Sequence, residues 1–327
     1  MKLILSLLIA TFFSLNIYAS EASGPIYLMA ALGDSISAAF LANTSLAKQS
    51  KIELPPFMTD QDMKNWIHAQ NFLDNKKTLS WTSGMKTSSH FAKLTQYFHR
   101  TEPTAILKMY NLAISGSKSQ DLVPQANQLY KAMQSGNYKA IKYITVLVGA
   151  NDACNQNYSE GTPISMMEDS LKTVFSILAQ IKQDEPIRIL VSGIPKIPDV
   201  GYPEIQMAKS IGGISCNYIQ THLFKACTLL TTWKTKPEYE ASVAIVVQKN
   251  ELLRRVVQEA NELYPNLSVV YTDMMFDRKI SVKDLAIDCF HPNQIAQSII
   301  SEKLWPQQPW FKQWSKKILA RTKNSAF

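Results

Sequence analysis

Ser35 combines a residue type and a position that could support covalent catalysis. It follows an apolar run at residues 26–32 and comes directly after Gly33 and Asp34. The run predicts a short buried strand, and residues 37–50 are expected to begin a helix, so Ser35 should lie on a tight turn. At the carboxyl edge of a parallel sheet, a serine on such a turn could act as a nucleophile. The alternative is that Asp34 and Ser35 only cap the helix, as these residue types often do.

A serine hydroxyl needs a base, and the base needs a partner that orients it. Of the five histidines, only His291 follows a predicted strand end with a carboxylate nearby, Asp288. Their spacing lets one short turn present both side chains, so Asp288 could accept from one ring nitrogen while the other faces Ser35. The competing interpretation is that Asp288 caps a helix and His291 is incidental. With Asp288 as the orienting carboxylate, Asp34 keeps only a structural role at its turn.

Acyl transfer also needs hydrogen-bond donors where negative charge develops on the carbonyl oxygen. Gly116 ends the second predicted strand and offers an unobstructed backbone N–H, and Asn151 ends the third and offers a side-chain amide. The backbone N–H of Ser35 would be the third donor. Each residue type is common at strand ends, but together they would bring a serine, its base and its oxyanion donors to one edge of the sheet.

Four short blocks of sequence contain these residues. They read Gly-Asp-Ser at residues 33–35, Asn-Leu-Ala-Ile-Ser-Gly at 111–116, Gly-Ala-Asn-Asp at 149–152 and Asp-Cys-Phe-His at 288–291. In this order they resemble the blocks of the SGNH (GDSL) hydrolases. The similarity is closest to the phospholipase B-like branch and covers roughly residues 25–305.

The resemblance implies a hydrolase of carboxylic esters, commonly of phospholipids or lysophospholipids. It implies Ser35 as the nucleophile, His291 as the base and Asp288 as the residue that orients it. It places Gly116 and Asn151, with Ser35, in the oxyanion hole. These assignments agree with the roles inferred above from residue types and spacing.

Strand-like and helix-like segments alternate along the chain, which predicts a parallel sheet covered on both faces. The resemblance implies a three-layer α/β/α flavodoxin-like fold, with a central parallel sheet of about five strands, over residues 23–305. Two insertions interrupt the alternation, at residues 51–87 and 195–236, and the second is expected to arch over the strand ends. The predicted strands are 26–32, 106–113, 143–148, 187–193 and 267–272.

The two ends of the chain differ from the central domain. Residues 1–19 show a basic start, an apolar stretch and a small residue at a cleavage point, which is typical of a signal peptide. We therefore expect an exported protein, periplasmic or extracellular; the alternative is an uncleaved membrane anchor. Residues 306–327 form a basic tail whose apolar face includes Trp310, Phe311 and Trp314, and it could lie on an anionic membrane surface or pack back on the domain.

The chain has four cysteines, which allow three disulfide connectivities. Cys154 follows Asn151 and Cys289 lies beside His291, so both should lie at the active edge. We therefore expect a Cys154–Cys289 disulfide, with Cys216–Cys227 closing a loop in the insertion. The alternative is four free, buried thiols.

Composition and the absence of other motifs limit the function classes. The net charge of +8 favours anionic partners, but no nucleic-acid-binding module is present. No zinc-type cysteine spacing, P-loop lysine or dinucleotide motif occurs, so neither a metal nor a cofactor is expected. The oligomeric state stays open.

The expected function is that of an exported serine esterase acting on lipid esters. Apolar side chains predicted near the active edge favour a lipid acyl chain, namely Phe40, Leu41, Trp81 and Phe290. An acyltransferase or a carbohydrate acetylesterase could use the same catalytic residues. From another class, the chain could be a binding protein on an inactive hydrolase scaffold.

Overall fold

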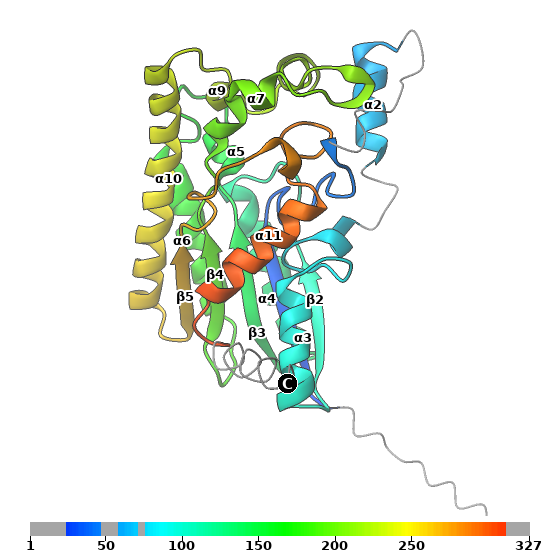
Figure 1. Ribbon diagram of the computed structural model, residues 1–327. Helices are drawn as coiled ribbons and strands as arrows, with labels where there is room; N and C mark the ends of the chain where they lie inside the picture. The colour runs from blue at the N-terminus through cyan, green and yellow to red at the C-terminus, as the bar shows by residue number, and fades with distance from the viewer. Residues whose placement is uncertain (1–23, 47–57, 71–75, 312–327) are drawn as a thin grey trace, which may run out of the picture.

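The computed structural model describes residues 24–46, 58–70 and 76–311. Its centre is a sheet of five parallel strands in the order β2-β1-β3-β4-β5, which is the flavodoxin-like order. Helices cover both faces, so the predicted three-layer α/β fold is confirmed (Figure 1). The strands are β1 (Ile26–Gly33), β2 (Ile106–Asn111), β3 (Ala140–Leu147), β4 (Ile187–Ser192) and β5 (Leu267–Thr272).

Two groups of helices form the outer layers. The helices α4 (Leu122–Gln134), α6 (Ile164–Ala179) and α10 (Lys236–Leu263) pack their apolar side chains on one face of the sheet. The helices α3 (His90–Thr101) and α11 (Gln294–Leu304) cover the other face, which is turned toward the viewer in Figure 1. The other described helices are α2 (Asp60–Gln70), α5 (Ala150–Ala153), α7 (Pro203–Gln206), α8 (Cys216–Tyr218) and α9 (Thr228–Thr231).

The central strands are buried on both faces. Every residue of β3, including Lys142 near its start, is buried, and so are seven of the eight residues of β1. Their apolar, partly β-branched sequences suit a strand covered from both sides. The edge strand β2 alternates between exposed and half-buried residues over its first four positions.

The strand order reverses direction between β1 and β3, which creates a switch point at the carboxyl edge of the sheet. Gly33 at the end of β1 pairs with Leu147 at the end of β3. Ser35 and Asn151 follow these two strand ends, so both lie where open α/β sheets bind their ligands.

Directly after Ser35, over residues 35–43, the chain does not form the helix that we expected to begin in residues 37–50; Leu46 is helical, and residues 47–50 lie outside the described residues. Residues 35–43 form successive turns, with left-handed backbone at Ala39 (φ 56°) and Leu41 (φ 54°). Two such residues in close succession exclude a right-handed helix. Side chains from other segments form hydrogen bonds with the backbone here instead. The Ser80 hydroxyl and the Asn111 amide both donate to the Ser37 carbonyl. With no helix there, the cap interpretation of Asp34 and Ser35 is wrong.

Only the beginning of the predicted tail lies within the described residues. Phe311 is buried in the cluster that includes Tyr143, and the Trp310 indole donates to the Ser268 hydroxyl at 2.9 Å. These first residues therefore pack back on the domain. Trp314 and the predicted signal peptide, residues 1–19, lie outside the described residues. Among the described helices, none has the length and apolar character needed to span a bilayer.

Candidate active site

Ser35, His291 and Asp288 form a continuous chain of hydrogen bonds. The Ser35 Oγ lies 2.8 Å from His291 Nε2, and His291 Nδ1 lies 2.5 Å from Asp288 Oδ2. The serine follows β1, while the other two residues lie on the loop before α11. The structure thus brings together three residues from opposite ends of the sequence in the order nucleophile, base and orienting carboxylate.

The loop that carries Asp288 and His291 is folded around the carboxylate. Asp288 Oδ1 accepts hydrogen bonds from the backbone N–H groups of Phe290 (3.2 Å) and His291 (3.1 Å). Burial alone would raise the pKa of the Asp288 carboxyl, but the charge of His291 and these hydrogen bonds outweigh it and hold the pKa below its ordinary value. Asn293, and not Asp288, caps α11, because its side chain accepts from the Ala296 N–H. The cap interpretation of Asp288 is therefore wrong.

The three expected oxyanion donors lie around the same cleft as the Ser35 hydroxyl. Gly116 has a φ of 87°, a conformation that favours glycine, and open space surrounds the position that a Cβ would occupy. The Asn151 amide donates one hydrogen to the Ser117 carbonyl at 3.0 Å, which leaves its second N–H for a ligand. The arrangement can therefore surround a carbonyl oxygen bound next to Ser35.

Two side chains that sequence reasoning left without a role hold these loops. The Gln125 carboxamide accepts from the Gly33 N–H at 2.8 Å and donates to the Gly33 carbonyl at 3.0 Å. The Asp152 carboxylate accepts from the backbone N–H and the hydroxyl of Ser119, both at 2.8 Å. Asp152 belongs to the block at residues 149–152, and the available signal for both residues was a polar side chain in an otherwise apolar stretch.

Asp34 supports the turn that presents Ser35. Its Oδ1 accepts from the Ile36 N–H at 2.9 Å, and the side chain is fully buried. Burial raises the pKa of Asp34 to about 7, and the nearby Asp152 adds to the effect while His291 opposes it. Among the described residues, no hydrogen bond joins Asp34 to His291. Asp288 is therefore the carboxylate that orients the histidine ring.

Two spaces of different character meet at Ser35. A narrow cavity of about 70 Å³ lies between α11 and the loops after β4 and β5. On the other side of the serine lies an open cleft of about 560 Å³. It is bordered by the loops after β2 and β3 and by the second insertion, residues 195–236, called the insertion from here on. Apolar side chains dominate the narrow cavity, among them Ile36, Ile197, Val200, Met275, Ile280, Leu285 and Ile300.

Of the apolar side chains expected near the active edge, two are there and two are not. The rings of Phe40 and Phe290 lie 4.8 and 5.2 Å from the His291 ring, between centroids. Leu41 and Trp81 are instead fully buried. Trp81 packs edge-on against the buried His90, so its aromatic character reflects the core and not a substrate surface.

The disulfide prediction is wrong. The bonds are Cys154–Cys227 and Cys216–Cys289, not Cys154–Cys289 and Cys216–Cys227, and none of the four thiols is free. Cys154 and Cys289 do lie beside the catalytic residues, as expected. The insertion, however, crosses over both of their loops, so each cysteine finds its partner in the insertion.

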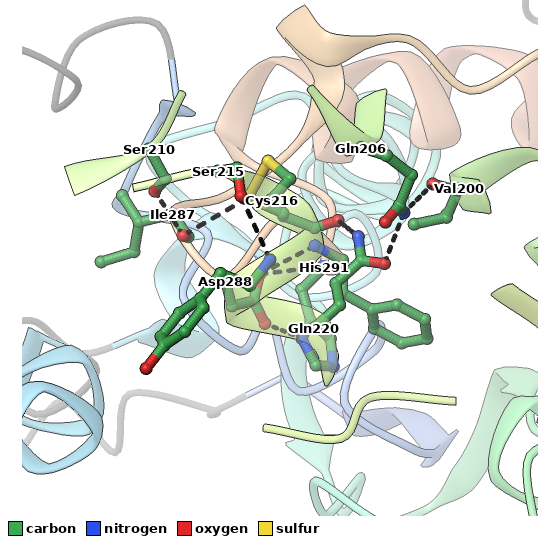
Figure 2. Close-up of a disulfide and its surroundings, with 12 residues drawn as sticks. Val200, Gln206, Ser210, Ser215, Cys216, Gln220, Ile287, Asp288 and His291 are labelled. Atoms are coloured by element: carbon green, nitrogen blue, oxygen red, sulfur yellow. Dashed lines mark hydrogen bonds and ion pairs between the residues drawn. A yellow bond between two sulfur atoms is a disulfide. The ribbon is translucent and has the colours of Figure 1, made fainter. Parts of the chain in front are cut away.

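Figure 2 shows how the insertion holds the loop that carries Asp288 and His291. Besides the Cys216–Cys289 bond, the Ser210 hydroxyl donates to the Ile287 carbonyl at 2.6 Å. The Gln220 amide donates to the Cys289 carbonyl at 2.7 Å. Three separate attachments therefore fix the loop within three residues of sequence, 287–289.

Among the described residues, no group of three or more His, Cys, Asp or Glu side chains is arranged to hold a metal ion.

Solved structures with a similar fold include several esterases and lipases. TesA is 13% identical with a TM-score of 0.42, and the match covers 86% of this chain and 97% of that one. A lipase from a goat rumen metagenome is 14% identical with a TM-score of 0.45, covering 86% and 97%. An acetyl xylan esterase variant from Geobacillus stearothermophilus is 13% identical with a TM-score of 0.42, covering 87% and 94%.

Comparison at the level of sequence gives a more specific result. No curated protein matches the chain closely enough to count as a relative. The model of the GDSL-like lipase/acylhydrolase family, in contrast, matches residues 29–304, from β1 through α11. These residues include every member of the Ser35 site, and the chain belongs to this family of ester hydrolases.

Proposed function

We propose that this protein is an exported serine esterase that hydrolyses acyl esters of lipids, with phospholipids or lysophospholipids as its substrate class. The observation that carries the proposal is the unbroken Ser35–His291–Asp288 chain beside an apolar cavity. Family membership supports ester hydrolysis in general. We infer the phospholipid substrate class from the sequence blocks that resemble the phospholipase B-like branch. We infer the export from residues 1–19.

In this mechanism the Ser35 hydroxyl attacks the ester carbonyl carbon while His291 Nε2 takes its proton. Asp288 stabilises the resulting imidazolium through Nδ1. The negative oxygen of the tetrahedral intermediate accepts hydrogen bonds from the N–H groups of Ser35 and Gly116 and from the Asn151 amide. When the intermediate collapses, His291 gives the proton to the departing alkoxide, and an acyl-serine ester remains.

The second half repeats the steps with water. His291 removes a proton from water, whose oxygen attacks the acyl carbon, and the new tetrahedral intermediate releases the carboxylic acid. Ser35 regains its proton from His291. An alcohol in place of water would give acyl transfer through the same steps.

The narrow cavity suits the acyl half of the ester. Met275, Ile280 and Ile300 form part of its walls, and their side chains offer no hydrogen-bond partner to a polar group. Among the described residues that line it, the one Lys or Arg side chain is Arg278, which is paired with Asp284 at 2.8 Å. The acyl chain would therefore enter between α11 and the loops after β4 and β5.

The size of this cavity supports a second candidate, hydrolysis of short acyl esters such as acetylated carbohydrates. A cavity of about 150 Å³ holds one benzene molecule. The volume here is about 70 Å³, which corresponds to a few carbon atoms in the closed part of the cavity. A longer chain would have to extend past its mouth.

The deciding experiment compares wild type with Ser35→Ala on phospholipid, lysophospholipid and acetylated-sugar substrates. We expect the wild type to release fatty acid from the lipid esters and the variant to lose this activity. A fluorophosphonate probe should label the wild type at Ser35. Unlabelled, inactive wild-type protein would instead indicate a binding protein on an inactive scaffold, and preferential acetate release would favour the second candidate.

A further inference from the structure

The open cleft beside Ser35 carries an unbalanced positive charge. Its charged or titratable lining side chains are Lys118, Lys225, His68, Asp288 and His291. Asp288 is the only carboxylate among them, and it is bound to His291. Burial and then the charge of Lys64 lower the pKa of His68, although Asp288 opposes the effect, so His68 is a weak contributor of charge.

The two lysines are therefore the cations that the cleft offers to a ligand. Of the ion pairs formed between described residues, none includes Lys118 or Lys225. Lys118 is half-buried and Lys225 is exposed at the border of the cleft. An ammonium group on a flexible stem in such a position is suited to a compact anion such as phosphate.

Both lysines lie on loops that are fixed to the catalytic strand ends. Lys118 comes two residues after Gly116, and its backbone N–H donates to Asp121 at 2.8 Å. Lys225 comes two residues before Cys227, which is bonded to Cys154 in the loop after β3. The backbone of the two lysines is thus tied to the loops that carry Gly116 and Asn151.

The cavity and the cleft on the two sides of Ser35 differ in charge. This difference assigns the acyl half of the ester to the cavity and the alcohol half to the cleft. The narrow cavity is mostly apolar, and Arg278, the one Lys or Arg among its described lining residues, is neutralised by Asp284. The open cleft holds Lys118 and Lys225 beside the uncharged side chains of Asn155 and Asn157. An anionic group is stabilised in the cleft and not in the cavity.

We infer that Lys118 and Lys225 bind a phosphate carried by the alcohol half of the substrate, which makes the substrate an acyl ester of a phosphorylated alcohol. This inference rests on the proposed esterase function, whose phospholipid substrates carry such a phosphate, and it assigns the residues that bind it. The lysines bind and orient the leaving group and take no part in proton transfer. Recognition of an uncharged sugar by the asparagines is the competing outcome.

The test uses three esters with the same short acyl chain, all below their micelle concentration. They are a 1-acylglycerol 3-phosphate, the corresponding 1-acylglycerol and the corresponding 6-acylglucose. The measured quantity is the ratio of kcat/KM for the phosphorylated ester to that for each neutral ester. The proteins are wild type, Lys118→Gln, Lys225→Gln, their double variant, and the control Lys182→Gln. Lys182 is an exposed lysine between α6 and β4, at the opposite edge of the sheet.

We expect wild type to prefer the phosphorylated ester, and the ratio to fall about tenfold in the double variant and less in each single one. The control should keep the wild-type ratio. Added salt should reduce the ratio in wild type and change it little in the double variant, because screening weakens only an interaction that is present. A merely structural role of the lysines would not alter this salt dependence.

An unchanged ratio in the double variant, or a wild-type preference for either neutral ester, would overturn the inference while leaving the esterase function intact. If wild type hydrolysed none of the three esters, the proposed function itself would fail together with the inference. The two failures are thus distinguished by the wild-type rates alone.

Discussion

The Gln125 carboxamide forms two hydrogen bonds with the backbone of Gly33, accepting at 2.8 Å and donating at 3.0 Å. Gln125 lies on α4, so the helix is attached to the end of β1 only two residues before the nucleophile. The Gly33 carbonyl also accepts from the Ile114 N–H, whereas Gln125 supplies the partner of the Gly33 N–H. The turn that carries Ser35 is thereby fixed to the helical layer.

Replacing Gln125 with alanine should therefore lower both stability and activity. The buried Gly33 N–H would lose its acceptor, which costs about 2 kcal/mol of unfolding free energy. Urea denaturation followed by circular dichroism measures this loss. The matched control is Gln128→Ala, an exposed glutamine on the same helix, which should change the unfolding free energy by less than about 0.5 kcal/mol.

Asp288→Asn should reduce kcat by about a thousand- to ten-thousandfold. The amide can still hydrogen-bond to the ring, but it cannot stabilise the imidazolium or hold the same tautomer. Steady-state kinetics on a soluble ester give the value. Asp277→Asn removes an exposed carboxylate elsewhere and should keep the wild-type rate. Retention of more than a tenth of the activity in Asp288→Asn would contradict the role given to this carboxylate.

Asn151→Ala tests the oxyanion hole. Loss of one donor should lower kcat by about a hundred- to a thousandfold with little change in KM, because the hydrogen bond strengthens only in the transition state. A rise in KM at constant kcat would show instead that Asn151 binds the ground state of the substrate.

The buried Asp34 predicts a pH dependence of stability. Its pKa is raised to about 7, so the folded protein retains a proton that the unfolded chain releases near pH 4. The unfolding free energy should therefore fall as the pH rises from about 4 to 7, by at most about 4 kcal/mol. Asp34→Asn keeps the acceptor for the Ile36 N–H and should remove this fall. Unfolding curves at a series of pH values compare the two proteins, and parallel profiles would refute the assignment to Asp34.

The two disulfides predict sensitivity to reductant. Each bond joins residues separated by 73 positions, and closing a loop of that length contributes about 4 kcal/mol in the chain-entropy model. Dithiothreitol should lower the midpoint of thermal unfolding of wild type, with a smaller shift in Cys154→Ala/Cys227→Ala. A variant without cysteines controls for other effects of the reductant and should show no shift.

Local sequence was sufficient to predict the site residues that closely follow the end of a single strand. Ser35 and Asn151 follow the ends of β1 and β3 within four residues, so their meeting point followed from parallel topology. The Asp288–His291 pair lies on the loop before α11, well after the end of β5, and was predicted from its three-residue spacing. The disulfide partners were not predictable in this way, because the path of the insertion over the catalytic loops depends on packing between distant segments. The apolar cluster that joins Ile211 and Ile219 of the insertion to Ile287 is an example.

The turns after Ser35 were misjudged for a related reason. Ser37, Ala38 and Ala39 are compatible with a helix, yet the Ser37 carbonyl is bound by side chains from two other segments. Such a tertiary contact overrides local preference and leaves no periodic signal in the sequence.

The pairing of Gly33 with Leu147 explains how hydrolases of this fold can change substrate without losing their catalytic geometry. The spacing between nucleophile and oxyanion donor is set by the backbone ladder of two adjacent strands, whatever side chains the neighbouring loops carry. The walls of the cavity and the cleft, in contrast, come from loops and an insertion, which tolerate replacement. Descendants of this scaffold can therefore acquire new substrates through mutation of the walls while inheriting the bond-breaking geometry unchanged.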